Sequence, residues 1–150
     1  MDSDSELDFE TVEDAIINAV RREMPDLKTV KNYAGELEEN DLKKMTFQFP
    51  AAFIIYRNSV ETWVDGQTFN EKATFAVFFA SKNFRGDEKV RKDTKKGIYK
   101  FLKKGMEVLT NKTFGLDIER LAPTRKYLVF TSKEWAAYGI DFVTNFDTNY

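Results

Sequence analysis

Two continuous apolar runs constrain the fold of this chain most. One covers residues 51–56 and the other residues 73–80, and in both nearly every position is apolar or small. A strand with one face in water alternates apolar and polar residues, whereas a run without alternation is typical of a strand covered on both faces. The sequence therefore predicts a sheet in which these two strands are central.

A turn signal lies between the two runs. Asp65 and Gly66 form the Asp-Gly pair that favours a tight hairpin turn, with Val60, Thr62 and Val64 alternating before it. This pattern predicts an antiparallel hairpin that links the two central strands.

Weaker strand patterns complete the predicted sheet. They cover residues 29–34, 118–131 and 135–146. Pro123 interrupts the second of these, and proline suits an edge strand or a bend because it has no N–H for a ladder hydrogen bond. In the last strand one predicted face carries Tyr138, Ile140, Phe142, Thr144 and Phe146.

Two helices are predicted. The first runs from an N-cap at Thr11 to about Glu23 and ends before Pro25. The second is predicted at residues 87–109, with Gly97 and Gly105 on its apolar side, where we expect the helix to approach the sheet closely. Its predicted buried stripe is Val90, Thr94, Ile98, Phe101, Leu102, Gly105 and Leu109.

The element order is therefore α-β-β-β-α-β-β, which indicates an α+β fold: a mostly antiparallel sheet with the two helices packed on one face. With 150 residues, we expect a single domain over residues 1–150, in which the acidic residues 1–10 form a flexible leader. The longest apolar run has eight residues, whereas a membrane helix needs roughly 20. We therefore expect no membrane partner, and the acidic start argues against a secretory signal.

Composition limits the chemistry. The chain has no cysteine and no histidine, which excludes imidazole-based catalysis, thiolate nucleophiles and His- or Cys-ligated metal sites. We expect no enzyme activity, no cofactor and no metal. The one catalytic pattern is nuclease-like, with Asp26 and the Asp41-Leu42-Lys43 triplet as metal-binding candidates. Because the triplet lies in the most polar part of the chain, an exposed loop is the alternative interpretation.

A basic segment and an acidic start give the chain charge polarity. The contact residues predicted from the basic segment are Lys92, Lys95, Lys96 and Lys103. The first fourteen residues contain seven acids and no base. Opposite charge in two parts of one chain suits head-to-tail contact between copies. A solvated helix face and, less favoured because Lys dominates and Arg is scarce, nucleic-acid binding are the alternatives.

The chain is rich in aromatic residues, with 14 Phe, 6 Tyr and 2 Trp. If both helices cover one sheet face, the other face still carries half of each apolar strand, drawn from Ile54, Tyr56, Phe78, Phe79, Leu128, Phe130 and Phe142. A monomer seldom exposes so large an apolar patch, so either loops or a second copy must cover it. We expect a second copy, with Tyr56, Phe78 and Phe130 as contacts, and we expect Asp65 and Gly66 to reach a neighbour.

Four short strings resemble a family of Mu-like phage and prophage proteins encoded among the tail genes. They are Val12-Glu13-Asp14-Ala15-Ile16, Tyr33-Ala34-Gly35-Glu36-Leu37, Phe49-Pro50-Ala51-Ala52 and Tyr138-Gly139-Ile140-Asp141-Phe142. In length and element order the chain is similar to phage tail-terminator, or tail-completion, proteins. The acidic leader and the hairpin at residues 58–72 depart from that resemblance.

The resemblance implies a structural protein of the virion tail or neck, assembled in the host bacterial cytoplasm. Its implied partners are copies of itself in a hexameric ring, the tail tube and sheath proteins, and the head–tail connector. Nucleic acid would be met only as DNA passing through the ring. No catalytic residue is implied. The alternatives are a head-completion or neck adaptor of the same particle and a nucleic-acid-binding or nuclease-like domain.

Overall fold

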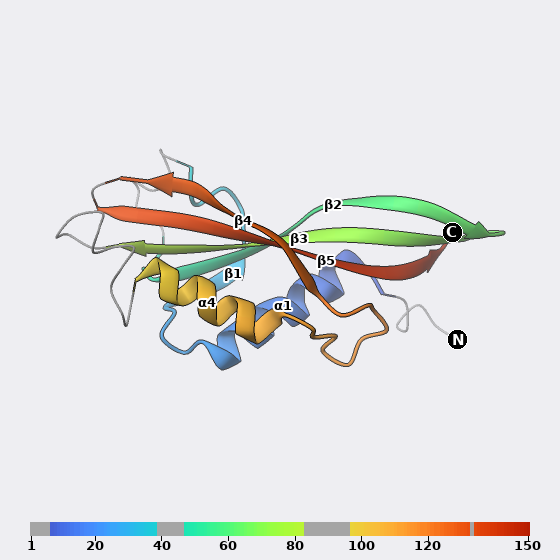
Figure 1. The fold of residues 1–150 in the computed structure, drawn as a ribbon, viewed down its shortest axis with the longest axis horizontal. Coiled ribbons are helices and arrows are strands. Elements are labelled where there is room, and N and C mark those ends of the chain that lie inside the picture. Colours follow the sequence, from blue (N-terminus) through green and yellow to red (C-terminus); the bar gives the residue numbers. More distant parts are fainter. Residues whose placement is uncertain (1–6, 39–46, 83–96, 133) are drawn as a thin grey trace.

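The computed structural model describes residues 7–38, 47–82, 97–132 and 134–150 (Figure 1). The elements follow the predicted order α-β-β-β-α-β-β, and the α+β class is confirmed. They are α1 (Phe9–Glu23), β1 (Thr29–Asn32), β2 (Ala51–Asp65), β3 (Thr68–Lys82), α4 (Ile98–Leu109), β4 (Ala122–Thr131) and β5 (Trp135–Asn149).

The five strands form one mostly antiparallel sheet in the order β1-β2-β3-β5-β4. Only β1 and β2 run parallel, and the other three pairs are antiparallel. The strand β3 is central, and the apolar start of β2 lies between β1 and β3, as the continuous apolar runs predicted. Pro123 lies in β4, which is an edge strand.

Both helices lie on one face of the sheet (Figure 1). Side chains alternate across a strand, so the odd-numbered apolar residues of β3 share the face that meets the helices. The core between the layers contains Val12, Ile16, Val20, Ile54, Phe75, Val77, Phe79, Ile98, Phe101, Leu109, Ile140 and Phe142. Burial of these side chains is the main force that holds the two layers together.

The first helix begins earlier than predicted. Its N-cap is Asp8 rather than Thr11, because the Asp8 carboxylate accepts hydrogen bonds from the Thr11 backbone N–H at 2.8 Å and from the Thr11 hydroxyl at 2.7 Å. These two bonds lower the pKa of Asp8. The predicted cap was wrong by one turn, since Asp and Thr are both good N-cap residues.

The second helix begins later than predicted. Gly97 has extended backbone angles, with φ −71° and ψ 152°, and α4 starts at Ile98. A single helix over residues 87–109 is therefore wrong, although residues 87–96 themselves lie outside the described residues. Glycine is a weak helix former, which explains the start at this position. The stripe from Ile98 to Leu109 is buried, as predicted.

The sheet is longer than the helix layer that covers it. The strands β2, β3 and β5 have 15 residues each, which corresponds to roughly 50 Å, whereas the 12 residues of α4 span about 18 Å. Neighbouring strands also end early, because β1 pairs with β2 only as far as Ile54 and β4 pairs with β5 only as far as Val143.

We call the free-standing part of these three strands the arm and define it as residues 58–72 and 144–149. Figure 1 shows it extending beyond both helices. The predicted turn lies at its tip, where Gly66 has a positive φ of 46° that suits glycine.

Gly105 explains how closely α4 approaches the sheet. A Cβ at this position would lie 2.7 Å from the ring of Phe79, which is fully buried. We predict that Gly105→Ala lowers the free energy of unfolding by about 1–3 kcal/mol, because overpacking outweighs the gain in helix propensity. Urea denaturation measures this change in the free energy of unfolding. Lys104→Ala, on the exposed side of the same helix, should change little, and equal stability of the two variants would contradict the close approach.

Candidate assembly surfaces

The sheet face away from the helices is covered by the chain itself. A second core cluster lies there, formed by Leu37, Phe47, Ala51, Phe53, Ala80 and Ala137. Phe47 meets the fully buried Phe53 at 4.9 Å between ring centroids, and Tyr33 meets Phe78 at 5.0 Å. Residues 33–37 and 47–49 cover much of this face, so the face is not bare as expected. Leu128 of the predicted set is nevertheless 52% exposed, and contact with a second copy stays a prediction.

An ion pair helps to hold this covering segment. The buried Glu36 carboxylate accepts a hydrogen bond from the Ala34 N–H at 2.6 Å and pairs with Lys31 of β1 at 2.9 Å. Burial opposes ionisation of Glu36, but these partners lower its pKa. The segment is thereby tied back to the strand from which it leaves.

The three aromatic residues predicted as contacts do not share one face. Tyr56 lies on the helix side, where its ring stacks on Phe9 at 3.9 Å. Phe78 and Phe130 belong to the opposite side and are half-buried, with Phe130 against Trp135 at 6.5 Å. From the wider predicted set, Ile54, Phe79 and Phe142 are fully buried on the helix side.

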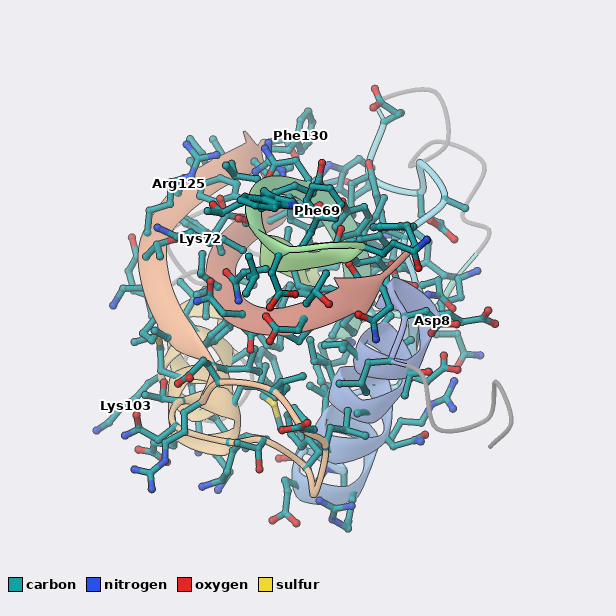
Figure 2. All side chains as sticks on the ribbon, turned by 90° about the vertical axis from the view of Figure 1, so that its right-hand side faces the viewer. Asp8, Phe69, Lys72, Lys103, Arg125 and Phe130 are labelled. Atoms are coloured by element: carbon teal, nitrogen blue, oxygen red, sulfur yellow. The ribbon has the colours of Figure 1, made fainter. Side chains whose placement is uncertain are left out.

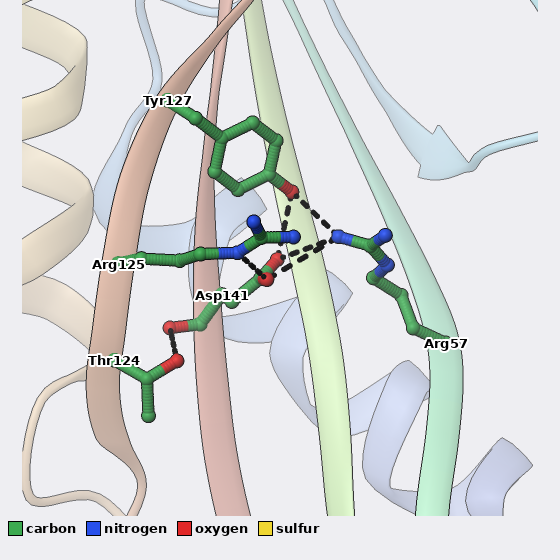
Figure 3. A network of polar contacts seen from close by, with 5 residues as sticks. All are labelled: Arg57, Thr124, Arg125, Tyr127 and Asp141. Atoms are coloured by element: carbon green, nitrogen blue, oxygen red, sulfur yellow. Dashed lines mark hydrogen bonds and ion pairs between the residues drawn. The ribbon is translucent and has the colours of Figure 1, made fainter.

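A polar network crosses the sheet face that points away from the helices (Figure 3). Asp141 of β5 is 4% exposed and accepts hydrogen bonds from Arg125 Nε at 2.7 Å and from the Tyr127 hydroxyl at 2.7 Å. Arg57 of β2 reaches the same carboxylate at 3.2 Å. The intervening strand β3 carries Ala76 opposite Asp141, and this small side chain leaves room for Arg57 to cross.

The contacts within this network set the ionisation states of Asp141 and Tyr127. Burial alone would raise the pKa of Asp141, but the hydrogen bonds from Arg125 and Tyr127 and the charge of Arg57 lower it. Burial and the hydrogen bond to Asp141 raise the pKa of Tyr127 to about 12. Near neutral pH the acid is ionised and the phenol is protonated. The network therefore joins β2, β4 and β5 rather than offering a proton-transfer group.

We predict that Asp141→Asn lowers the free energy of unfolding at pH 7 by about 1.5–3 kcal/mol, because the amide group would face donors only. The lowered pKa means that the carboxylate stabilises the fold above the unfolded pKa of about 3.9 and loses this effect as pH falls. The difference between variant and parent should therefore shrink below about pH 4 in urea titrations. Asp147→Asn, exposed on the same strand, is the control.

The predicted basic contact is described only in part. Lys103 is exposed on α4 together with Lys100 and Lys104. Lys92, Lys95 and Lys96 lie outside the described residues. The exposed side of α4 is thus a lysine face within the described part, which we define as Lys100, Lys103 and Lys104.

The tip of the arm carries Asp65 and Gly66, as predicted from the turn signal. Exposed apolar side chains lie beside it: Trp63 is 63% exposed, Val64 is 48% exposed, and Tyr150 is 68% exposed. The sequence reasoning did not single out Trp63 or Tyr150, although a tryptophan next to a predicted turn was a usable signal. Such a projecting tip fits a contact with another molecule better than it fits a lone monomer.

A cavity of about 710 Å³ lies where the helix layer ends and the arm begins. Its lining includes the carboxylates of Asp8, Glu71, Asp117, Glu119 and Asp147, and no lysine or arginine of the described residues. Glu71 is only 3% exposed. Burial, with the nearby Glu61 carboxylate, raises its pKa, while the hydroxyl of Thr148 opposes the shift. Nothing in the sequence pattern marked Glu71, because the cavity is formed by segments far apart in the chain.

The described residues give little support to the nuclease-like metal site that the sequence offered. Asp26 is exposed, and its proposed partners Asp41 and Lys43 lie outside the described residues. Across residues 7–38, 47–82, 97–132 and 134–150, no three acidic side chains are grouped so that they could hold a metal ion. Neither described helix is long and apolar enough to cross a membrane.

A protein-family model with the description "Bacteriophage Mu, Gp37" matches residues 9–147. The chain belongs to this family. The match runs from the first residue of α1 almost to the end of β5, so it includes the lysine face and most of the arm and of the cavity lining. Comparison with curated proteins finds no match.

Membership in the Bacteriophage Mu Gp37 family confirms the resemblance to Mu-like phage proteins that the four short strings carried. All four strings lie within the matched residues. The family supports a structural phage protein of the tail region, which works with other proteins of the virion.

Proposed function

We propose that this protein is a tail terminator. Copies of it form a ring on the head-proximal end of a contractile phage tail or a phage-tail-like particle.

 
The ring stops the growth of the tail tube and sheath and offers its other surface to the head–tail connector. The observation that carries the proposal is the family match over residues 9–147.

The geometry supports a role in assembly. The arm extends beyond the helix layer and carries exposed Trp63 and Val64 near its tip, where the exposed Tyr150 also lies. A lone molecule gains little from holding such side chains in water, whereas a subunit contact would bury them. The two ends of the sheet also differ, since the arm lies at one end and α4 lies near the other (Figure 1). Unlike surfaces of this kind suit the heterologous contacts from which rings are built.

A terminator needs no catalytic group, because it acts by capping a polymer. One ring surface must match the end of the tube, and the other must offer nothing to which a further tube ring can add. The Asp141 network fits this role, because its hydrogen bonds fix the positions of three strands. We therefore propose a protein that is not an enzyme and that needs no cofactor.

Particles assembled without this protein test the proposal. We expect tails longer than those of the parent phage, because tube growth lacks its stop, and electron microscopy of negatively stained lysates measures the length distribution. Supplying the intact protein from a plasmid should restore the parental length. Unattached tails of normal length would contradict the terminator and would instead support a head-completion or neck adaptor.

A further inference from the structure

Neither α1 nor α4, the helices of the described residues, lies beneath the helix-side face of the arm (Figure 1). Glu71 pairs with Glu61 on β2 and with Phe146 on β5, and Phe146 packs into the core beside Phe9. Alternation along the strands therefore puts Trp63 and Phe69, two residues farther out, on this same face. Figure 2 looks at the molecule from the arm side and shows Asp8 at the start of α1, below the arm.

This face is acidic where it meets the cavity. Glu71 is almost fully buried, and no lysine or arginine pairs with it among the described residues. Asp8, Asp117 and Glu119 line the same cavity. A buried carboxylate without a cation is costly, and a nearby positive charge would offset the cost. The cavity is therefore suited to an ammonium or guanidinium group that comes from outside the described part of the molecule.

We propose that the arm of one copy binds the lysine face of α4 of a second copy. Lys100, Lys103 and Lys104 are exposed and lie within one turn of each other, so they present a compact positive surface. Their ammonium groups pair with the carboxylates of the cavity, and their alkyl stems pack against the aromatic side chains of the arm. The second copy's helix takes the place beneath the arm that the first copy's own helices leave open.

A second copy fits this place because the two surfaces cannot meet within one molecule. The arm and α4 lie toward opposite ends of the sheet (Figure 1), and Figure 2 shows Lys103 pointing outward from the molecule. Each copy therefore offers one acidic and one basic surface, which repeats head to tail and can close into a ring. The inference specifies a contact within the proposed ring and rests on the proposed function. Self-association itself can be measured without a phage.

Charge reversal tests the contact in the full chain. Lys103→Glu and Glu119→Lys should each raise the dissociation constant for self-association about tenfold or more, and the double variant should restore it. Sedimentation velocity over a concentration series measures this. Asp26→Lys and Lys28→Glu, both exposed and remote from the cavity lining, are the matched controls. The inference would be overturned if the parent protein remained monomeric or if the single variants associated like the parent. It would also be overturned if the double variant did not regain the self-association of the parent.

The variant Glu71→Gln distinguishes a role of Glu71 in self-association from a role in the stability of the fold. The raised pKa of Glu71 means that its ionised form destabilises the isolated fold above that pKa, so the variant should unfold at the same or a higher urea concentration at pH 7. Its self-association should nevertheless be weaker, because the buried negative charge is lost. Association equal to that of the parent would count against the cavity as the binding site.

Tail length distinguishes this inference from the proposed function. Particles carrying Glu119→Lys should have overlong tails, and the double variant should return them toward the parental length. If particles without the protein have overlong tails while the Glu119→Lys particles are normal, the terminator stands and this contact is overturned.

Discussion

The structure depends on burial of β3 on both of its faces. Phe75, Val77 and Phe79 lie under the helices, while Ala80 and Phe78 belong to the cluster on the other side. The strand also pairs along its length with β2 and β5. If either face of β3 were open to water, aromatic rings would be exposed, so the helices on one side and residues 33–37 and 47–49 on the other are both required.

The difference in length between sheet and helices gives the molecule two unlike ends. Where α1 and α4 cover the sheet, the core is closed, and Gly105 allows close contact with Phe79. Beyond them the arm carries exposed apolar side chains such as Trp63, and a carboxylate, Glu71, that has no cation from its own chain in the described residues. The features left unsatisfied in one molecule are therefore concentrated at the surface where an assembly contact would form.

Much of the fold could be predicted from local patterns, and the errors have local causes. The unbroken apolar runs, the Asp65-Gly66 turn and Pro123 at an edge identified the sheet, since each reports a constraint on a single strand or turn. The start of α1 was misjudged because Asp8 caps as well as Thr11 does. The surfaces were harder to predict. Tyr56 was assigned to the wrong side of the sheet because nothing local indicates which face the helices will cover.

The sequence by itself determined the α+β class, the order of the elements and the absence of histidine and cysteine chemistry, because these follow from periodicity, turn residues and composition. Only the tertiary structure decided which aromatic residues are covered, how Arg57, Arg125 and Tyr127 meet at Asp141, and that Glu71 lies in an acidic cavity. Such contacts join residues far apart in the chain. Their geometry depends on the register and packing of whole elements, which no short stretch of sequence specifies.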